Sequence, residues 1–325
     1  MAVEALMVLA ISTFILAKSS EVVVESAVKL ARFFHIGTLA IGMLLVAVST
    51  SLPELSVSVV SSSAGEGAIA AGNVFGSNIA NILLILGLGA ALYGFRVDKE
   101  SLKDIGIVLV LTTAISAYVL FHSLVFGSAL GLYEGVALLI IAGWYGMRML
   151  SKKRMDGGHA EKEVTRHEGM VAFLLFFAAI FIVIISSSFV VSSAVELADA
   201  FGLAKSFIGA TIIAIGTSLP ELTIDLQAIR KKQYGLALGD AIGSNMANIT
   251  LVLGVAAAIN PITVTLGVFV AALLFAVVAN IAFFYVAAIK KAFGRREGIA
   301  MLLLYALYLV VIFSLQFSAI PSAGG

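Results

Sequence analysis

The chain contains no cysteine and few charged residues. The absence of cysteine excludes disulfides, thiolate metal sites and cysteine nucleophiles. Asp, Glu, Lys and Arg make up only 12% of the 325 residues, whereas about a quarter is usual in a soluble domain. With a net charge of +1 and no basic stripe with interleaved aromatic residues, the sequence gives no support to nucleic-acid binding. The four histidines form no ligand-spaced pair, so no histidine metal site is indicated.

Apolar residues make up 61% of the chain and occur in long runs. Because a spanning helix needs roughly 20 apolar residues, we predict an all-α polytopic protein of the cell membrane with ten transmembrane helices. Their expected centres are near residues 10, 48, 79, 113, 138, 183, 217, 246, 274 and 308. The first apolar run lacks a basic n-region, so it is predicted to be a membrane helix rather than a signal peptide. The charged residues that follow it, from Lys18 to Lys29, suggest a tilted helix that continues past the membrane.

Basic residues predict the orientation of these helices. Lys and Arg concentrate in the loops after spans one, three, five, seven and nine, and the even-numbered loops offer only Lys205. By the positive-inside rule the odd-numbered loops are cytoplasmic. Both termini are then expected outside, and the charged linker 151–168 is expected in the cytoplasm.

A motif occurs twice, at a constant offset of 167 residues. Its first copy reads AVSTSLPE from Ala47 and GSNIAN from Gly76, and its second reads AIGTSLPE from Ala214 and GSNMAN from Gly243. The offset divides the chain into a five-helix repeat at 1–150, with its motif region at 42–87, and a second at 169–320, with its motif region at 209–254; residues 321–325 form a tail. Since five is odd, the second repeat is predicted to have inverted topology, which places substrate near the interface between the halves.

The first part of each motif places a proline and a carboxylate inside an apolar span. Pro53 and Pro220 each remove a helical hydrogen bond, which predicts a local break in the helix. Glu54 and Glu221 follow directly, and ionisable residues at such depth indicate a functional site. The hydroxyl residues before each proline are Thr50 and Ser51 in one copy and Thr217 and Ser218 in the other.

The second part of each motif adds oxygen groups on one helix face. Ser77 and Asn81 are four residues apart, as are Ser244 and Asn248. Every candidate ligand is an oxygen, which hard cations such as Ca²⁺ and Na⁺ prefer. Two glutamates balance the charge of one Ca²⁺, so the pair predicts a Ca²⁺ site. A role of the small and polar residues in helix packing is the competing interpretation, but recurrence at constant spacing argues against it.

Two further acids in the second copy have uncharged counterparts in the first. Asp225 corresponds to Ser58, and either lines an access path or pairs with Arg230 or Lys231. Asp240 corresponds to Asn73 and is interpreted as a cytoplasmic helix-start residue rather than a central ligand.

With TSLPE followed by GSNxxN, twice, the sequence resembles the Ca²⁺/cation antiporter superfamily, and prokaryotic Na⁺/Ca²⁺ exchangers in particular. The resemblance implies ten helices, four short helices around a central group of cation sites, and spans one and six sliding across them. It implies that Glu54 and Glu221 bind Ca²⁺ together with the carbonyls of Thr50 and Thr217. The Na⁺ sites that it implies involve the carbonyls of Ala47 and Ala214 and the side chains of Ser51, Ser218, Ser77 and Ser244.

The sequence departs from the family pattern at two positions. Asn248 stands where K⁺-dependent relatives have an aspartate, so K⁺ coupling is not expected, and Ser49 replaces a usual glycine. We expect a monomeric antiporter, not an enzyme, that exchanges Ca²⁺ for Na⁺ and has no cofactor. H⁺/Ca²⁺ exchange through the same glutamates is the alternative, although the G-N-x-x-E motif of that branch is absent. A cation channel or a Mg²⁺-handling protein is a more distant alternative, and no hydrolase motif such as H-E-x-x-H is present.

Overall fold

The computed structural model describes residues 2–65, 67–126, 130–151, 164–200, 216–262 and 266–318, which are almost entirely helical. Three of the helical segments, labelled η, are π-helical turns. In the first part of the chain the elements are α1 (Ala2–Phe33), α2 (Thr38–Ile41), η1 (Gly42–Val46), α3 (Ala47–Thr50), α4 (Leu52–Ser63), α5 (Gly67–Ile79), η2 (Ala80–Ile85), α6 (Leu86–Leu92), β1 (Phe95–Arg96), α7 (Lys99–Phe126) and α8 (Leu132–Leu150). They continue with α9 (Arg166–Ala200), α12 (Leu219–Arg230), α13 (Tyr234–Ala247), η4 (Asn248–Val252), α14 (Leu253–Ile259), α15 (Leu266–Ile289), β2 (Ala292–Phe293) and α16 (Arg295–Ser318).

Within the described residues, 7 helices are long and apolar enough to cross a membrane, or up to 8 if a bent pair at 38–63 is one span. The predicted span near residue 138 coincides with α8, which is not among them. Much of the predicted span near residue 217 lies outside the described residues. The chain is therefore a helical membrane protein, and the count of ten remains a prediction.

The chain forms two compact units, each of which contains segments from both halves of the sequence. One unit consists of residues 1–53 and 143–244, and the other of residues 54–142 and 245–325. The repeat boundaries expected from the sequence, 1–150 and 169–320, describe a different division and stay a prediction.

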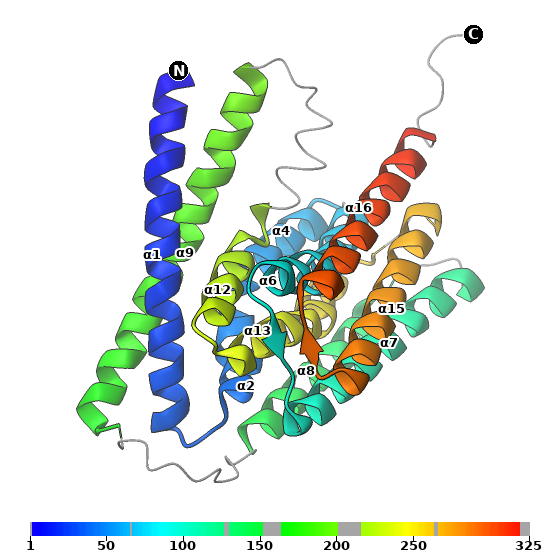
Figure 1. Ribbon diagram of the computed structural model, residues 1–325. Helices are drawn as coiled ribbons and strands as arrows, with labels where there is room; N and C mark the ends of the chain where they lie inside the picture. The colour runs from blue at the N-terminus through cyan, green and yellow to red at the C-terminus, as the bar shows by residue number, and fades with distance from the viewer. Residues whose placement is uncertain are drawn as a thin grey trace. The chain divides into compact units, whose positions relative to one another are not determined.

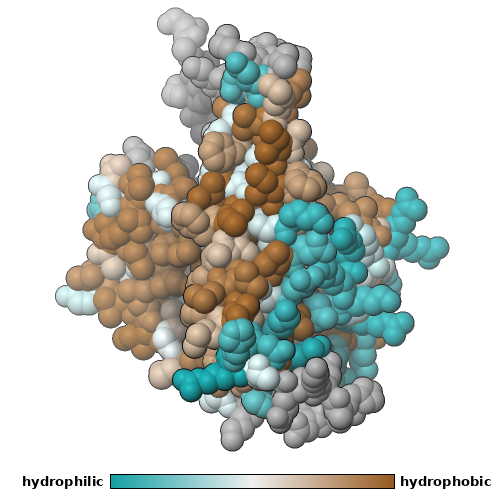
Figure 2. All heavy atoms as spheres, turned by 90° about the vertical axis from the view of Figure 1, so that its left-hand side faces the viewer, coloured by the Kyte–Doolittle hydropathy of each residue, from teal (hydrophilic) through white to brown (hydrophobic). Residues whose placement is uncertain are grey.

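In the first unit, the long helices α1 and α9 run side by side (Figure 1). Their outer surfaces expose large apolar side chains such as Ile11, Phe14 and Phe181. Figure 2 looks at this side of the molecule, and brown, apolar side chains cover much of it. Such an apolar surface is suited to contact with lipid, since in a soluble monomer exposed apolar patches are small.

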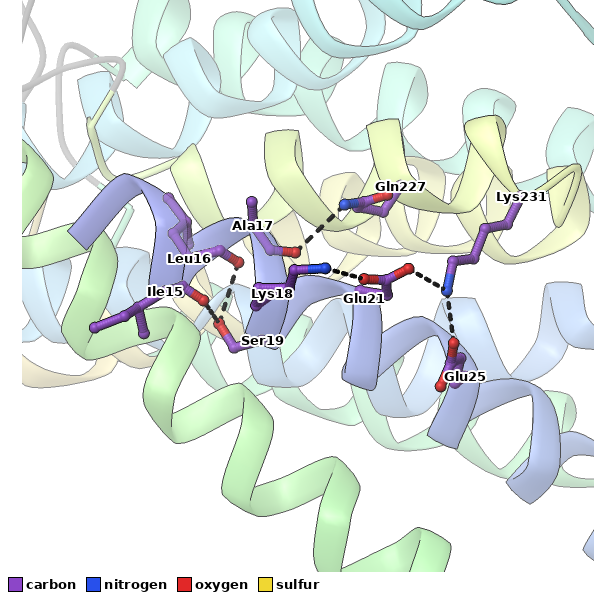
Figure 3. A network of polar contacts seen from close by, with 9 residues as sticks. All are labelled: Ile15, Leu16, Ala17, Lys18, Ser19, Glu21, Glu25, Gln227 and Lys231. Carbon is purple, nitrogen blue, oxygen red and sulfur yellow. Dashed lines mark hydrogen bonds and ion pairs between the residues drawn. The ribbon is translucent and has the colours of Figure 1, made fainter. Parts of the chain in front are cut away.

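Helix α1 also packs against α12, and its middle part carries a polar network (Figure 3). The Lys231 ammonium lies 3.0 Å from a Glu21 carboxylate oxygen and 2.7 Å from one of Glu25. The Gln227 amide donates to the Ala17 carbonyl at 3.3 Å. The prediction that the first helix continues through its charged residues is confirmed, because α1 is uninterrupted from Ala2 to Phe33.

The backbones of the 38–46 segment and α13 meet in this unit without side chains between them. A Cβ atom added to Gly42 would lie 2.5 Å from the Leu236 carbonyl oxygen, and one added to Gly239 would lie 2.3 Å from the Leu39 carbonyl oxygen. Only glycine fits at both positions, which explains why Gly42 and Gly239 stand at this crossing.

In the second unit, α7 packs on α15 and α6 packs on α16. The two-residue strands β1 and β2 pair antiparallel (Figure 1), with Phe95 opposite Phe293 and their rings stacked at 4.7 Å. This short pairing joins the segments that lead into α7 and α16.

The order of elements recurs along the chain at the offset of the motif. The elements whose first residues are 167 apart are α4 and α12, α5 and α13, α6 and α14, and α7 and α15. Equivalent residues in the two motif copies therefore occupy equivalent places in their helices.

Candidate cation-binding site

Each motif copy interrupts its helix directly before the Leu-Pro-Glu sequence. In the first copy α3 ends at Thr50 and α4 begins at Leu52, with Ser51 between them at φ −78° and ψ 5°. In the second copy Ser218 has a similar backbone, φ −92° and ψ 12°, and α12 begins with Pro220 in its first turn. The predicted breaks are thus confirmed, because proline favours the start of a helix and disfavours its interior.

The second compact unit contains a group of four residues that we call the Glu54 cluster: Glu54, Ser58, Asn73 and Ser77. Glu54 is fully buried, and the Ser77 hydroxyl donates to its Oε1 at 3.4 Å. The Asn73 amide donates to the Glu54 backbone carbonyl at 3.0 Å and to the Ser58 hydroxyl at 3.1 Å. These contacts hold α5 against α4 and bring together Ser77 and Glu54, two of the predicted cation ligands.

Beside this cluster, four asparagines of the two GSNxxN sequences form a symmetric arrangement. Asn78 and Asn245 each donate an amide hydrogen to the other's backbone carbonyl at 3.2 Å. Asn81 donates to the Asn245 Oδ1 at 3.0 Å, and Asn248 donates to the Asn78 Oδ1 at 3.1 Å. The structural role of Asn78 and Asn245 was not predicted from the sequence, although their recurrence in both motifs marked them.

The arrangement fixes the orientation of the two predicted asparagine ligands. Because the amide nitrogens of Asn81 and Asn248 donate to their neighbours, their Oδ1 atoms point elsewhere, and both are buried without a hydrogen-bond partner. A buried polar atom normally has a partner. An amide oxygen left in this way is a suitable ligand for a hard cation.

The first compact unit contains the equivalent residues, which we call the Glu221 cluster: Glu221, Asp225, Asp240 and Ser244. All four are buried. The hydroxyls of Thr50 and Ser244 donate to Asp240 Oδ1 at 3.1 and 3.3 Å. The same repeated framework therefore carries three carboxyl groups here and one in the Glu54 cluster.

The interpretation of Asp240 and one of the two alternatives for Asp225, an ion pair, were wrong. Asp240 does not start a helix, because α13 begins at Tyr234 and Asp240 is fully buried in its middle. Asp225 does not pair with Lys231, which binds Glu21 and Glu25 instead. Among the described residues no ion pair joins Asp225 to Arg230 either. Hydropathy along the sequence could not place these acids, because their surroundings include residues far away in the sequence, such as Thr50 beside Asp240.

The other predicted ligands are placed as follows. The Ala47 carbonyl accepts the Ser51 N–H at 3.0 Å and the Ser244 hydroxyl at 3.4 Å. The Ser51 hydroxyl is buried and has no hydrogen-bond partner. Thr217 is half-buried and Ser218 is buried. Ala214 lies outside the described residues.

The described part of the chain contains no group of three or more His, Asp or Glu side chains that could hold a metal ion. Any cation bound at either cluster would therefore need hydroxyl, amide or carbonyl oxygens besides carboxylates. Na⁺ and Ca²⁺ accept such mixed oxygen ligands, whereas a catalytic or structural Zn²⁺ site requires His, Cys and carboxylate side chains.

Long apolar helices define a membrane protein, and buried oxygen groups at paired helix breaks are typical of ion transporters. The chain matches the sodium/calcium exchanger protein family over residues 4–148 and 171–314, two segments whose starts are separated by the offset of the motif. It therefore belongs to this family.

Individual relatives agree with the family match. Inner membrane protein YrbG of Escherichia coli (strain K12) is 35% identical over 244 residues, which cover 72% of this chain and 74% of the relative. The sodium/calcium exchanger MaX1 of Methanosarcina acetivorans is 28% identical over 94% of this chain and 98% of its own length. A structure of the sodium-calcium exchanger NCX_Mj superposes with a TM-score of 0.83 at 27% identity, covering 95% of this chain and 99% of that one.

Proposed function

We propose that this protein is a secondary active antiporter that exchanges Ca²⁺ for Na⁺ by alternating access. The observation that carries the proposal is the recurrence of a buried glutamate, Glu54 or Glu221, directly after a broken helix and among oxygen groups. Family membership and the names of MaX1 and NCX_Mj support exchange of Ca²⁺ for a cation.

Glu54 and Glu221 are proposed as the carboxylate ligands of Ca²⁺. No Lys or Arg occurs in residues 36–95 or 206–229, which contain the two glutamates, so the motif segments supply no basic neighbour along the chain. A buried carboxylate is costly unless a partner compensates its charge. The proposed additional ligands are the carbonyls of Thr50 and Thr217 for Ca²⁺, and oxygen groups of Ala47, Ala214, Ser51, Ser218, Ser77, Ser244, Asn81 and Asn248 for Ca²⁺ or Na⁺.

H⁺ is the second candidate for the counter-ion, because protonation would also neutralise a glutamate after Ca²⁺ leaves. The unpaired amide oxygens of Asn81 and Asn248 favour Na⁺. An amide oxygen binds a metal cation but is not protonated near neutral pH, so these groups would not contribute to proton binding.

The driving ion can be identified with purified protein in proteoliposomes. Ca²⁺ uptake is compared in vesicles loaded with Na⁺, in vesicles with only a pH gradient, and in vesicles with neither. We expect uptake into the Na⁺-loaded vesicles alone. Uptake driven by the pH gradient alone would identify H⁺, rather than Na⁺, as the counter-ion. Uptake without either gradient would contradict antiport.

Glu54→Gln and Glu221→Gln should each lower the rate of exchange roughly 100-fold or more, because loss of a charged ligand costs about 3 kcal/mol and 1.4 kcal/mol is tenfold. Glutamine keeps the shape of the side chain, so the folded protein should persist in gel filtration. Exposed Glu196→Gln is the matched control and should exchange normally. Normal exchange in both motif variants would contradict the proposal that Glu54 and Glu221 bind Ca²⁺.

A further inference from the structure

Asp225 and Asp240 form a fully buried pair of acids in the Glu221 cluster. Each carboxyl group interacts electrostatically with the other. Two ionised carboxylates cannot hydrogen-bond to each other, since neither carries a donor hydrogen. Two buried like charges are costly, so a bound cation or a proton would stabilise the pair.

The surroundings leave several carboxyl oxygens of the pair without a donor. Neither oxygen of Asp225 has a hydrogen-bond partner, and the same is true of Asp240 Oδ2. The charged neighbour of Asp225 besides Asp240 is another acid, Glu221, which lies one turn earlier on α12. Arg230, Lys231 and Lys232 stand at the end of α12, and Lys231 is bound to the two glutamates of α1.

The oxygen groups around Asp240 extend this pair. The hydroxyls of Thr50 and Ser244 reach its Oδ1, and the Ser244 hydroxyl also lies 3.4 Å from the Ala47 carbonyl. Each hydroxyl oxygen keeps lone pairs for a cation when its hydrogen points to Oδ1. Two carboxylates, two hydroxyls and a carbonyl supply a donor set made only of oxygen, as hard cations require.

At the equivalent positions of the other motif copy, neutral residues hydrogen-bond to each other and need no cation. There Ser58 and Asn73 replace the two aspartates, and the Asn73 amide donates to the Ser58 hydroxyl. The framework therefore does not need acids at these positions for packing. Their presence in only one copy points to a ligand.

We propose that Asp225 and Asp240 are the carboxylates of a second cation site, which shares Ala47 and Ser244 with the ligands proposed above and binds one Ca²⁺. Two carboxylates balance the charge of one divalent ion, whereas one Na⁺ would leave a buried negative charge uncompensated. The choice of Ca²⁺ rests on the proposed function, whereas the cation site itself rests on the buried, unpartnered oxygens of the two aspartates and on the hydroxyl groups beside Asp240.

Counting bound Ca²⁺ tests the site. Equilibrium binding of radioactive Ca²⁺ to the purified full-length chain is measured for the wild type, Glu54→Gln/Glu221→Gln, Asp225→Ser/Asp240→Asn, and the combination of all four substitutions. The Ser/Asn pair copies the residues of the other motif copy, so it is expected to fold. Glu21→Gln/Glu25→Gln removes two acids elsewhere in the same unit and is the matched control.

We expect the Glu54/Glu221 variant to retain about one Ca²⁺ per chain, because the carboxylate, hydroxyl and carbonyl oxygens around Asp225 and Asp240 are unchanged in it. The fourfold variant should bind none, and the control should bind as the wild type does. If the Glu54/Glu221 variant binds none, or if Asp225→Ser/Asp240→Asn binds as much as the wild type, the second site is refuted. An infrared band of a protonated carboxyl that the Asp225/Asp240 variant lacks and Ca²⁺ does not change would also refute it, and would assign the charge balance to a proton.

The binding counts are independent of the exchange assay. Absence of exchange in wild-type proteoliposomes would overturn the antiporter proposal, whereas a Ca²⁺ retained by the Glu54/Glu221 variant would still support the second site.

Discussion

The Glu54 cluster and the Glu221 cluster have the same residue spacing on equivalent helices, but they compensate polar groups in different ways. In the Glu54 cluster, Asn73 donates hydrogen bonds to the Glu54 carbonyl and to Ser58, so the positions beside the glutamate are neutral. In the Glu221 cluster, Asp225 and Asp240 place two more acids there, without a donor between them. The two motif copies thus have similar local backbone structure but differ in charge.

Asn78 and Asn245 make equivalent hydrogen bonds in the two motif copies, so substituting each of them tests whether the copies are equally important for stability. Each donates one amide bond and accepts another, so Asn78→Ala and Asn245→Ala each leave two buried groups without partners. We expect each change to lower stability by about 3 kcal/mol, and by the same amount within error. Thermal unfolding in detergent measures this, and a large difference between the variants would show that the two copies are not energetically equivalent.

Exchanging residues between the clusters tests the point where the copies differ. Asn73→Asp removes the donor to Ser58 and to the Glu54 carbonyl and adds an acid near Glu54, so stability should fall by about 2 kcal/mol. The reverse change, Asp240→Asn, restores a donor opposite Asp225 and should not lower the unfolding temperature when Ca²⁺ is absent. Equal destabilisation by both would mean that the clusters do not differ in their need for a cation.

The smallest expected effect concerns Lys231, whose counterpart in the first copy is Ala64. Lys231→Met removes the contacts with Glu21 and Glu25 (Figure 3). These groups are partly exposed, so the loss should be under about 1 kcal/mol and should shrink as salt is added. The unfolding temperature at low and high salt checks this, with Lys232→Met as control. A loss that salt does not reduce would point to packing of the lysine stem rather than to charge.

The repeated motif predicted the local structure well because its causes are local. Pro53 and Pro220 determine where the helices break, and the breaks occur at Ser51 and Ser218. The spacing of GSNxxN predicted oxygen groups on one helix face, and Asn81 and Asn248 are both buried. These inferences needed only backbone geometry and the position of polar residues within apolar runs.

Contacts between distant segments could not be predicted in the same way. Lys231 lies more than 200 residues after Glu21 and Glu25, and no periodicity pairs α1 with α12. Asp240 was interpreted as a helix-start residue because it lies near the start of the predicted eighth span, yet its hydrogen-bond partners include Thr50 on another segment. Whether Glu54 and Glu221 share one ion, and whether the two halves have opposite orientation, stay predictions.

The glycine crossing between Gly42 and Gly239 has a mechanical consequence. Where two backbones touch directly, no flexible side chain can absorb a relative displacement, and close-packed atoms transmit it. Asp240 follows Gly239 in α13, and Thr50 lies two turns beyond Gly42 along its own segment. A displacement of Asp240 by a bound ion would therefore move the 38–50 segment and α13 together as one rigid body, because the two backbones are in direct contact at the glycine crossing.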